Sequence, residues 1–108
     1  MELNVQQRDG ATVVKVLIPR LDASMAANFK NQLIEVIKDG VAKLVLDLSA
    51  VGFIDSSGLG ALVSVLKAMN GKGSIAIAGA NATVTGLFKL TSMDRVFSIY
   101  PNVDAVFA

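Results

Sequence analysis

Apolar residues recur along this chain in two rhythms, one typical of strands and one of helices. Residues 3–8 and 12–18 flank Asp9-Gly10, which predicts a two-residue hairpin turn between two strands. The second run alternates imperfectly, as a half-buried strand would. The run KLVLDL at 43–48 is almost continuously apolar, which is typical of a strand covered on both faces. Two further short runs predict strands, SIAIAG at 74–79 and FSIY at 97–100.

Two segments with helical spacing follow the hairpin and the first buried strand. Asp22 or Ser24 can cap a helix that ends near Gly40. Its apolar face comprises Met25, Phe29, Leu33, Val36 and Ile37. The second helix begins in the segment FIDSSGLG and ends before Gly71 and Gly73. Its apolar stripe comprises Leu59, Leu62, Val63, Leu66 and Met69.

Two shorter helices complete the pattern. Asn81 or Thr83 can cap a third helix, whose apolar residues are Val84, Leu87, Phe88 and Leu90. A last helix is expected to begin at Pro101, with Val103, Val106 and Phe107 on one side. The predicted order β-β-α-β-α-β-α-β-α indicates an α/β fold in which helices pack on a mixed sheet.

Composition narrows the class of protein. The 108 residues, 53% of them hydrophobic, fit one domain over residues 1–108 with a core that needs no metal or disulfide. A net charge of +1 with scattered lysines argues against nucleic-acid binding. The start MELNVQQRDG lacks the features of a signal peptide, and no apolar run reaches the roughly 18 residues of a membrane span. With no cysteine, we expect a cytoplasmic protein without membrane insertion.

The segment FIDSSGLG places a carboxylate and two hydroxyls between a buried strand and a helix. Asp55, Ser56 and Ser57 are all helix-capping residue types, and the glycines that follow permit a tight strand-to-helix turn. The first N–H groups of a helix and its positive dipole end also favour added negative charge. A hydroxyl at this position is therefore a candidate acceptor for a phosphate group.

Several catalytic and ligand-binding interpretations lack the residues that they require. A nucleophile elbow needs Gly-x-Ser-x-Gly and a base, yet Ile54 stands two residues before Ser56 and the chain has no histidine. A dinucleotide fingerprint would need glycine at Val63, and the sequence has no phosphate-binding loop with Gly-Lys-Ser/Thr. A phospho-receiver domain could use Asp47, which follows a buried strand. However, this chain lacks the acidic pair that such domains carry after their first strand. A Ser-Lys dyad stays open. We expect no cofactor, and no metal because the carboxylates are spread out and histidine and cysteine ligands are absent.

The segment LVLDLSAVGFIDSSGLGALVSVLKAM resembles the signature of the STAS family, the sulphate transporter and anti-sigma factor antagonist domains. More narrowly, it is similar to the small free-standing bacterial anti-sigma factor antagonists. The resemblance also covers the first hairpin, Leu21-Asp22 and the run IYPNVDA, and it departs at Pro19, where relatives often carry glycine. It implies the STAS fold, with a mixed, mostly parallel sheet of about five strands and about four helices.

The same resemblance implies a non-catalytic protein that is itself a kinase substrate. Ser56 matches the serine that an anti-sigma factor with serine kinase activity phosphorylates. The unphosphorylated form would bind that partner and release a sigma factor, and a serine phosphatase would reset it. Four further residues match positions at or near the partner surface: Asp22, Ser57, Gly58 and Leu59. Asp55 adds a like charge beside the phosphate, so repulsion and desolvation would switch binding without refolding.

One face of the second helix has only small residues, namely Ser57, Gly60, Ala61, Ser64 and Ala68. Another protein could approach this face closely, or the face could be solvated or pack on the neighbouring helix. We expect a monomer or a weak dimer. Three other functions stay open: a STAS subunit of a transporter ATPase or another partner-switching pathway, a small enzyme with Ser56 as nucleophile, and a nucleotide-binding or structural module.

Overall fold

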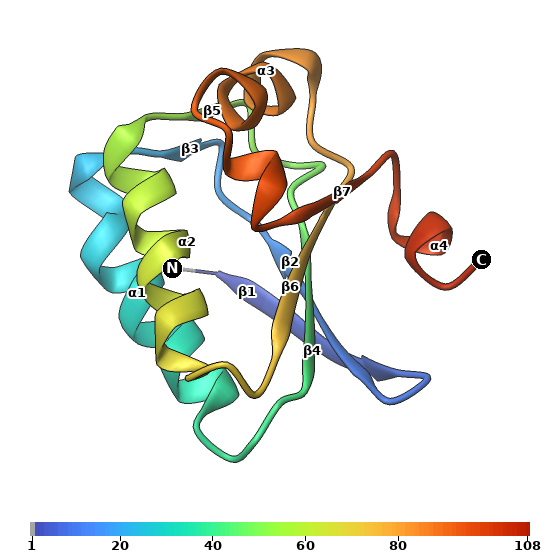
Figure 1. The fold of residues 1–108 in the computed structure, drawn as a ribbon. Helices are drawn as coiled ribbons and strands as arrows, with labels where there is room; N and C mark the ends of the chain where they lie inside the picture. The colour runs from blue at the N-terminus through green and yellow to red at the C-terminus, as the bar shows by residue number, and fades with distance from the viewer. Residues whose placement is uncertain (1) are drawn as a thin grey trace.

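A five-stranded mixed sheet forms the centre of the fold, and the computed structural model describes residues 2–108 (Figure 1). Its strands lie in the order β1-β2-β4-β6-β7, with β1 antiparallel to β2 and all other neighbours parallel. The strands are β1 (Leu3–Arg8), β2 (Ala11–Val16), β4 (Lys43–Asp47), β6 (Ser74–Ala78) and β7 (Ser98–Tyr100). The predicted mixed, mostly parallel sheet is confirmed.

Three helices cover one face of this sheet and one short helix covers the other (Figure 1). They are α1 (Ala23–Ile37), α2 (Ser56–Ala68), α3 (Ala82–Leu90) and α4 (Val103–Val106). The first three enclose the main core, whose largest fully buried side chains include Phe29, Leu33, Leu62, Phe88 and Phe97. Strand β4 contributes to both faces, since Leu44, Val45 and Leu46 are all completely buried, as its apolar run predicts.

Local sequence signals set most of the element ends. Asp9 and Gly10 both have positive φ, 50° and 81°, as a two-residue hairpin turn of the primed type requires. Asp22 caps α1, and Asn81 caps α3 by accepting the N–H of Val84 at 2.8 Å. After α1, Gly40 takes a φ of +93° and its N–H donates to the carbonyl of Ile37. These predicted caps and turns are confirmed.

Helix α4 covers a strip of small side chains on the second face of the sheet. The strip includes Ala11, Val45, Ala76 and Ala78, and it packs against Val106 with Phe107 at its margin. Arg8 of β1 fastens α4, because its Nη1 lies 2.7 Å from Oδ1 of Asp104 and its guanidinium stacks 4.4 Å from the centre of the Phe107 ring. This contact joins α4 to the first strand.

Three predicted details are wrong. Leu90 does not face the core but is 84% exposed, because it lies two residues beyond the buried Phe88 and therefore about 200° around the helix. Helix α4 begins at Val103 rather than at Pro101, since Asn102 is its cap. The core stripe of α2 is also rotated from the predicted one, so that Val65 is completely buried while Val63 and Leu66 are only partly so.

A second sheet of two strands was not predicted. Strands β3 (Arg20–Leu21) and β5 (Phe53–Ile54) pair in parallel, with Arg20 beside Phe53 and Leu21 beside Ile54. A short 3-10 helix, η1 (Met93–Arg95), also precedes β7. Elements of two or three residues are too short to show a hydrophobic period. Within residues 2–108, no helix has the length and apolar character needed to cross a lipid bilayer.

Candidate functional site

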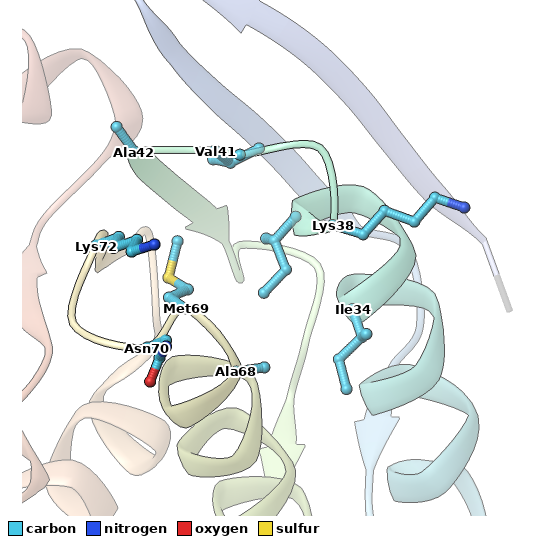
Figure 2. Close-up of a pocket in the computed structure, with 10 residues that line it drawn as sticks. Ile34, Lys38, Val41, Ala42, Ala68, Met69, Asn70 and Lys72 are labelled. Carbon is cyan, nitrogen blue, oxygen red and sulfur yellow. The ribbon is translucent and has the colours of Figure 1, made fainter.

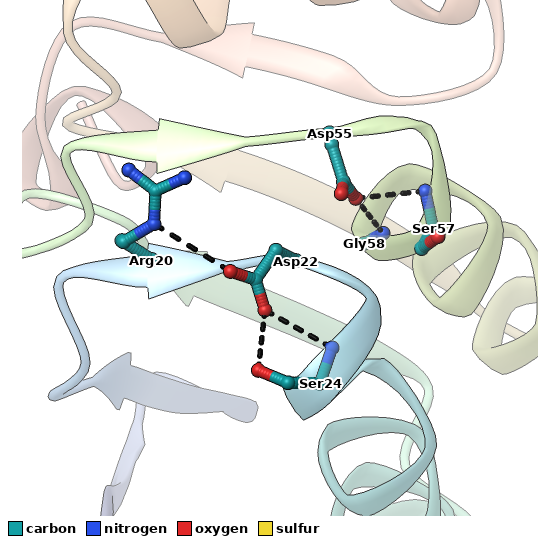
Figure 3. Close-up of polar contacts among 6 residues, drawn as sticks. All are labelled: Arg20, Asp22, Ser24, Asp55, Ser57 and Gly58. Atoms are coloured by element: carbon teal, nitrogen blue, oxygen red, sulfur yellow. Dashed lines mark hydrogen bonds and ion pairs between the residues drawn. The ribbon is translucent and has the colours of Figure 1, made fainter.

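The two-stranded sheet brings the starts of α1 and α2 together. Each strand leads directly into one of these helices, β3 into α1 and β5 into α2. The backbone N–H of Asp55 also donates to the carbonyl of Leu21 at 3.3 Å, which extends the pairing to the helix caps. As a result, Asp22 and Asp55 lie at the same end of neighbouring strands (Figure 3). The structure thus assembles the predicted site from two segments that are far apart in the sequence.

Asp55 is the N-cap of α2. Its Oδ1 accepts hydrogen bonds from the backbone N–H groups of Ser57 at 2.9 Å and Gly58 at 3.1 Å (Figure 3). Ser56 is the first residue of the helix and is exposed, and its hydroxyl makes no hydrogen bond within residues 2–108. Of the three residues that could have capped the helix, Asp55 does so, and the Ser56 hydroxyl is available for chemistry.

Replacing Asp55 with alanine should lower the free energy of unfolding by about 1 kcal/mol, because two helix N–H groups lose their acceptor. Ser56→Ala is the matched control and should change it by less than about 0.5 kcal/mol, since its hydroxyl supports no cap. Urea denaturation of both variants measures the difference. An equal loss in both would show that Ser56 is a structural residue.

Hydrogen bonds from Ser24 hold the carboxylate of Asp22 in a fixed position. Its Oδ1 accepts from the Ser24 hydroxyl at 2.6 Å and from the Ser24 N–H at 3.1 Å. The Ser24 hydroxyl is the main cause of a lowered pKa for Asp22; burial opposes it, and the Ser24 N–H and Arg20 add to it. Asp22 is therefore ionised at neutral pH, and the site presents two carboxylates.

Arg20 is a member of the site that the sequence did not single out. Its Nε lies 3.5 Å from Oδ2 of Asp22 (Figure 3). Its guanidinium also stacks 4.3 Å from the centre of the Phe53 ring. Arg20 and Phe53 are also partners in the β3–β5 pairing. No local pattern predicts this contact, because it depends on strand pairing. Arg20 is thus engaged on both sides, by a carboxylate and by an aromatic ring.

Gly58 is buried where α2 crosses β3. A Cβ atom at this position would lie 2.3 Å from the carbonyl oxygen of Leu21 and 2.8 Å from its Cγ. The φ of Gly58 is not positive, so close packing rather than backbone conformation requires glycine here. Gly58 therefore allows α2 to pack closely against β3 next to the site. It cannot offer a side chain to a partner.

The small-residue face of α2 divides between two environments. A shallow hollow of about 210 Å³ lies between α1 and α2 beside the site, lined by Ala26, Ala27, Lys30, Ser57, Ala61 and Ser64. Ala61 is only 6% exposed, whereas Gly60 is open to solvent and Ser57 and Ser64 are partly so. Leu59 is also 6% exposed and belongs to the core. Part of this face therefore packs on α1, and the rest remains accessible.

Another hollow, of about 580 Å³, lies at the opposite ends of α1 and α2. It is lined by apolar side chains such as Ile34 and Met69, with Lys38 and Lys72 at its margin (Figure 2). The Lys38 ammonium group is bound to Glu35 at 2.6 Å. Within the described residues, neither this hollow nor any other place gathers three or more acidic side chains that could hold a metal ion.

Comparison with known proteins identifies the family. Residues 2–106 match the STAS domain, and the chain belongs to this family. A Thermotoga maritima protein with the provisional name of anti-sigma factor antagonist is 34% identical over 94 residues, which are 83% of each chain. The anti-sigma F factor antagonist of Paenibacillus polymyxa is 28% identical, over 94% of this chain and 88% of its own.

The solved structures agree with this assignment. The crystal structure of an anti-sigma factor antagonist from Mycobacterium paratuberculosis superposes with a TM-score of 0.85 and 28% identity. The match covers 95% of this chain and 87% of the other. The predicted STAS fold is therefore confirmed.

Proposed function

We propose that this protein is an anti-sigma factor antagonist that phosphorylation of Ser56 switches off. In the proposed cycle, the unphosphorylated chain binds an anti-sigma factor with serine kinase activity, and a sigma factor is released. Phosphorylation of Ser56 ends this binding, and a serine phosphatase restores it. The single observation that carries the proposal is the exposed Ser56 hydroxyl, which stands at a helix start already capped by Asp55.

The charges around Ser56 support a switch that acts by repulsion. Phosphoserine carries about −1.5 to −2 charges at neutral pH. Asp55 is the adjacent residue, and Asp22 follows the neighbouring strand, so the phosphate joins two carboxylates. Arg20 already contacts Asp22 and Phe53. A partner that covers the site would have to desolvate this concentration of negative charge, which costs binding energy unless the partner supplies cations.

The hydrogen bonds around Ser56 support a switch that needs no refolding. The amides of Ser57 and Gly58 are bound by Asp55, so a phosphate on Ser56 displaces no bond of the cap. The positive end of the helix dipole favours the added charge by about 0.3–1 kcal/mol. The modified protein therefore keeps its fold, and the partner detects the difference at the surface.

Mass spectrometry after incubation with the kinase tests the proposed modification. We expect one phosphate, located on Ser56, which persists in Ser57→Ala and disappears in Ser56→Ala. Ser57 is a sharp control because it is adjacent in sequence but partly enclosed in the hollow between α1 and α2. Phosphate on Ser57, or on Ser56→Ala protein, would contradict the assignment.

Co-purification tests the proposed partner separately. Unphosphorylated protein should retain an anti-sigma factor, and the Ser56→Asp variant should not. Retention of a transporter ATPase instead would favour a STAS regulatory subunit over a sigma-factor pathway. Hydrolysis of acyl or phosphoryl esters by the purified chain, lost in Ser56→Ala, would instead indicate an enzyme.

A further inference from the structure

Strand β1 is a regular edge strand in which the one charged side chain, Arg8, lies at the end of the strand. Among residues 2–108, no strand pairs with the outer side of β1. All six residues pair in continuous register with β2, so the strand has no bulge, and it contains neither proline nor lysine. Five of its six residues, from Asn4 to Arg8, are exposed. Natural sheets usually block such edges, because a long regular edge can pair with another strand.

The hairpin determines which backbone groups are free on this edge. A two-residue turn makes Arg8 and Ala11 a hydrogen-bonded pair, and the N–H of Leu17 donates to the carbonyl of Glu2 at 3.0 Å. Hydrogen-bonded residues alternate along an antiparallel strand, so the even-numbered residues of β1 bond to β2. The N–H and C=O groups of Leu3, Val5 and Gln7 therefore point away from the sheet.

We propose that β1 pairs antiparallel with β1 of a second copy of this chain, about a two-fold axis at Val5. Val5 then faces Val5 of the second copy, and Leu3 faces Gln7 in both directions. Each facing pair exchanges two N–H···O bonds, so all the free groups of the three outward residues are satisfied. The two sheets join into one continuous sheet. This inference depends on the fold alone and not on the proposed role of Ser56.

Side-chain charges favour this register over its neighbours. With the axis at Val5, Glu2 of each copy lies opposite Arg8 of the other, and the amides of Asn4 and Gln6 are opposite each other. Shifting the axis by one residue leaves one outward residue of each copy unpaired and separates Glu2 from Arg8. Arg8 uses Nη1 for Asp104, and its guanidinium has further donors. The strand is thus self-complementary, as a two-fold interface requires.

Burial of Val5 adds an apolar contribution. Val5 is 46% exposed in the single chain, one of four large hydrophobic side chains with such exposure in the described residues. Pairing brings it against the same residue of the second copy. Because the interface is one strand wide, the association is expected to be weak and to depend on concentration.

Sedimentation velocity from about 10 µM to about 1 mM protein tests the association. We expect a monomer–dimer equilibrium whose dissociation constant rises at least tenfold in Val5→Lys, because two ammonium groups would meet at the axis. Val96→Lys is the matched control, since Val96 is 50% exposed and lies outside β1, and it should dimerise normally. Thermal melting of both variants checks that they are folded. A monomer at every concentration, or equal effects of the two substitutions, would overturn the proposal.

Disulfide cross-linking tests the register. The chain has no cysteine, so one introduced thiol reports one distance. Facing residues of a hydrogen-bonded pair have Cα atoms about 5.5 Å apart, which a disulfide can bridge. Val5→Cys should therefore cross-link under mild oxidation. Asn4→Cys should not, because Asn4 faces Gln6 and its own copy is displaced by two residues, beyond the roughly 7 Å limit. Equal cross-linking of the two variants would refute this register.

Discussion

Phosphorylation of Ser56 is expected to weaken binding of the anti-sigma factor by more than a hundredfold. An interface closed over phosphoserine desolvates a double charge beside Asp55, and a penalty of about 3–4 kcal/mol is sufficient for that loss. Ser56→Asp introduces a single charge and should weaken binding at least tenfold. Isothermal titration calorimetry with the purified partner measures both effects.

Ser56→Asn separates charge from shape. Asparagine is nearly the size of aspartate but neutral, so we expect most of the affinity to remain in this variant. The melting temperature should stay unchanged or rise slightly in Ser56→Asp, because the added charge lies at the positive end of the α2 dipole. Equal affinity of phosphorylated and unphosphorylated protein would end the proposed switch. A loss of affinity as large in Ser56→Asn as in Ser56→Asp would show that the shape of the side chain, and not its charge, weakens binding.

Replacing Gly58 with alanine should lower the free energy of unfolding by about 2–4 kcal/mol. The added methyl group would lie 2.3 Å from the Leu21 carbonyl oxygen and 3.1 Å from Cγ2 of Ile54. Backbone and core atoms cannot move aside as an exposed side chain can, so α2 must shift away from the two-stranded sheet. Denaturation by urea, followed by circular dichroism, measures the loss.

Gly60→Ala provides the matched control in the same turn of α2. A Cβ atom at Gly60 meets nothing within 4 Å, so only helix propensity changes. Alanine is favoured over glycine in a helix by about 1 kcal/mol, and Gly60→Ala should therefore be neutral or stabilising. If both variants lost stability equally, the close approach of α2 to β3 would not be the cause.

Much of the fold could be predicted because its signals are local. The Asp9-Gly10 turn, the caps at Asp22 and Asn81, and the doubly buried β4 each follow from the residues of one segment. The segment around Ser56 is found in the same way, from hydroxyl and carboxylate residues between a strand and a helix, while the choice of Ser56 within it comes from the resemblance to the STAS family. Such features need no knowledge of tertiary contacts.

The remaining features depend on contacts between distant segments. The β3–β5 pairing joins two dipeptides, and it alone places Arg20 on Phe53 and Asp22 near Asp55. Gly58 was expected to permit a tight turn, but its actual constraint is the carbonyl of Leu21. The small-residue pattern of α2 also could not show that Ala61 would pack toward α1. Strand pairing and helix packing had to be known first.

The paired β3 and β5 also determine how stiff the surface around Ser56 is. The two strands are joined by backbone hydrogen bonds. Strand β3 continues into α1 and β5 into α2, and these two helices pack against each other. The starts of α1 and α2 therefore cannot separate or tilt independently without breaking this pairing. In the proposed switch, a partner would meet a surface of the same shape before and after phosphorylation, so docking would cost little conformational entropy and electrostatics would discriminate the two forms.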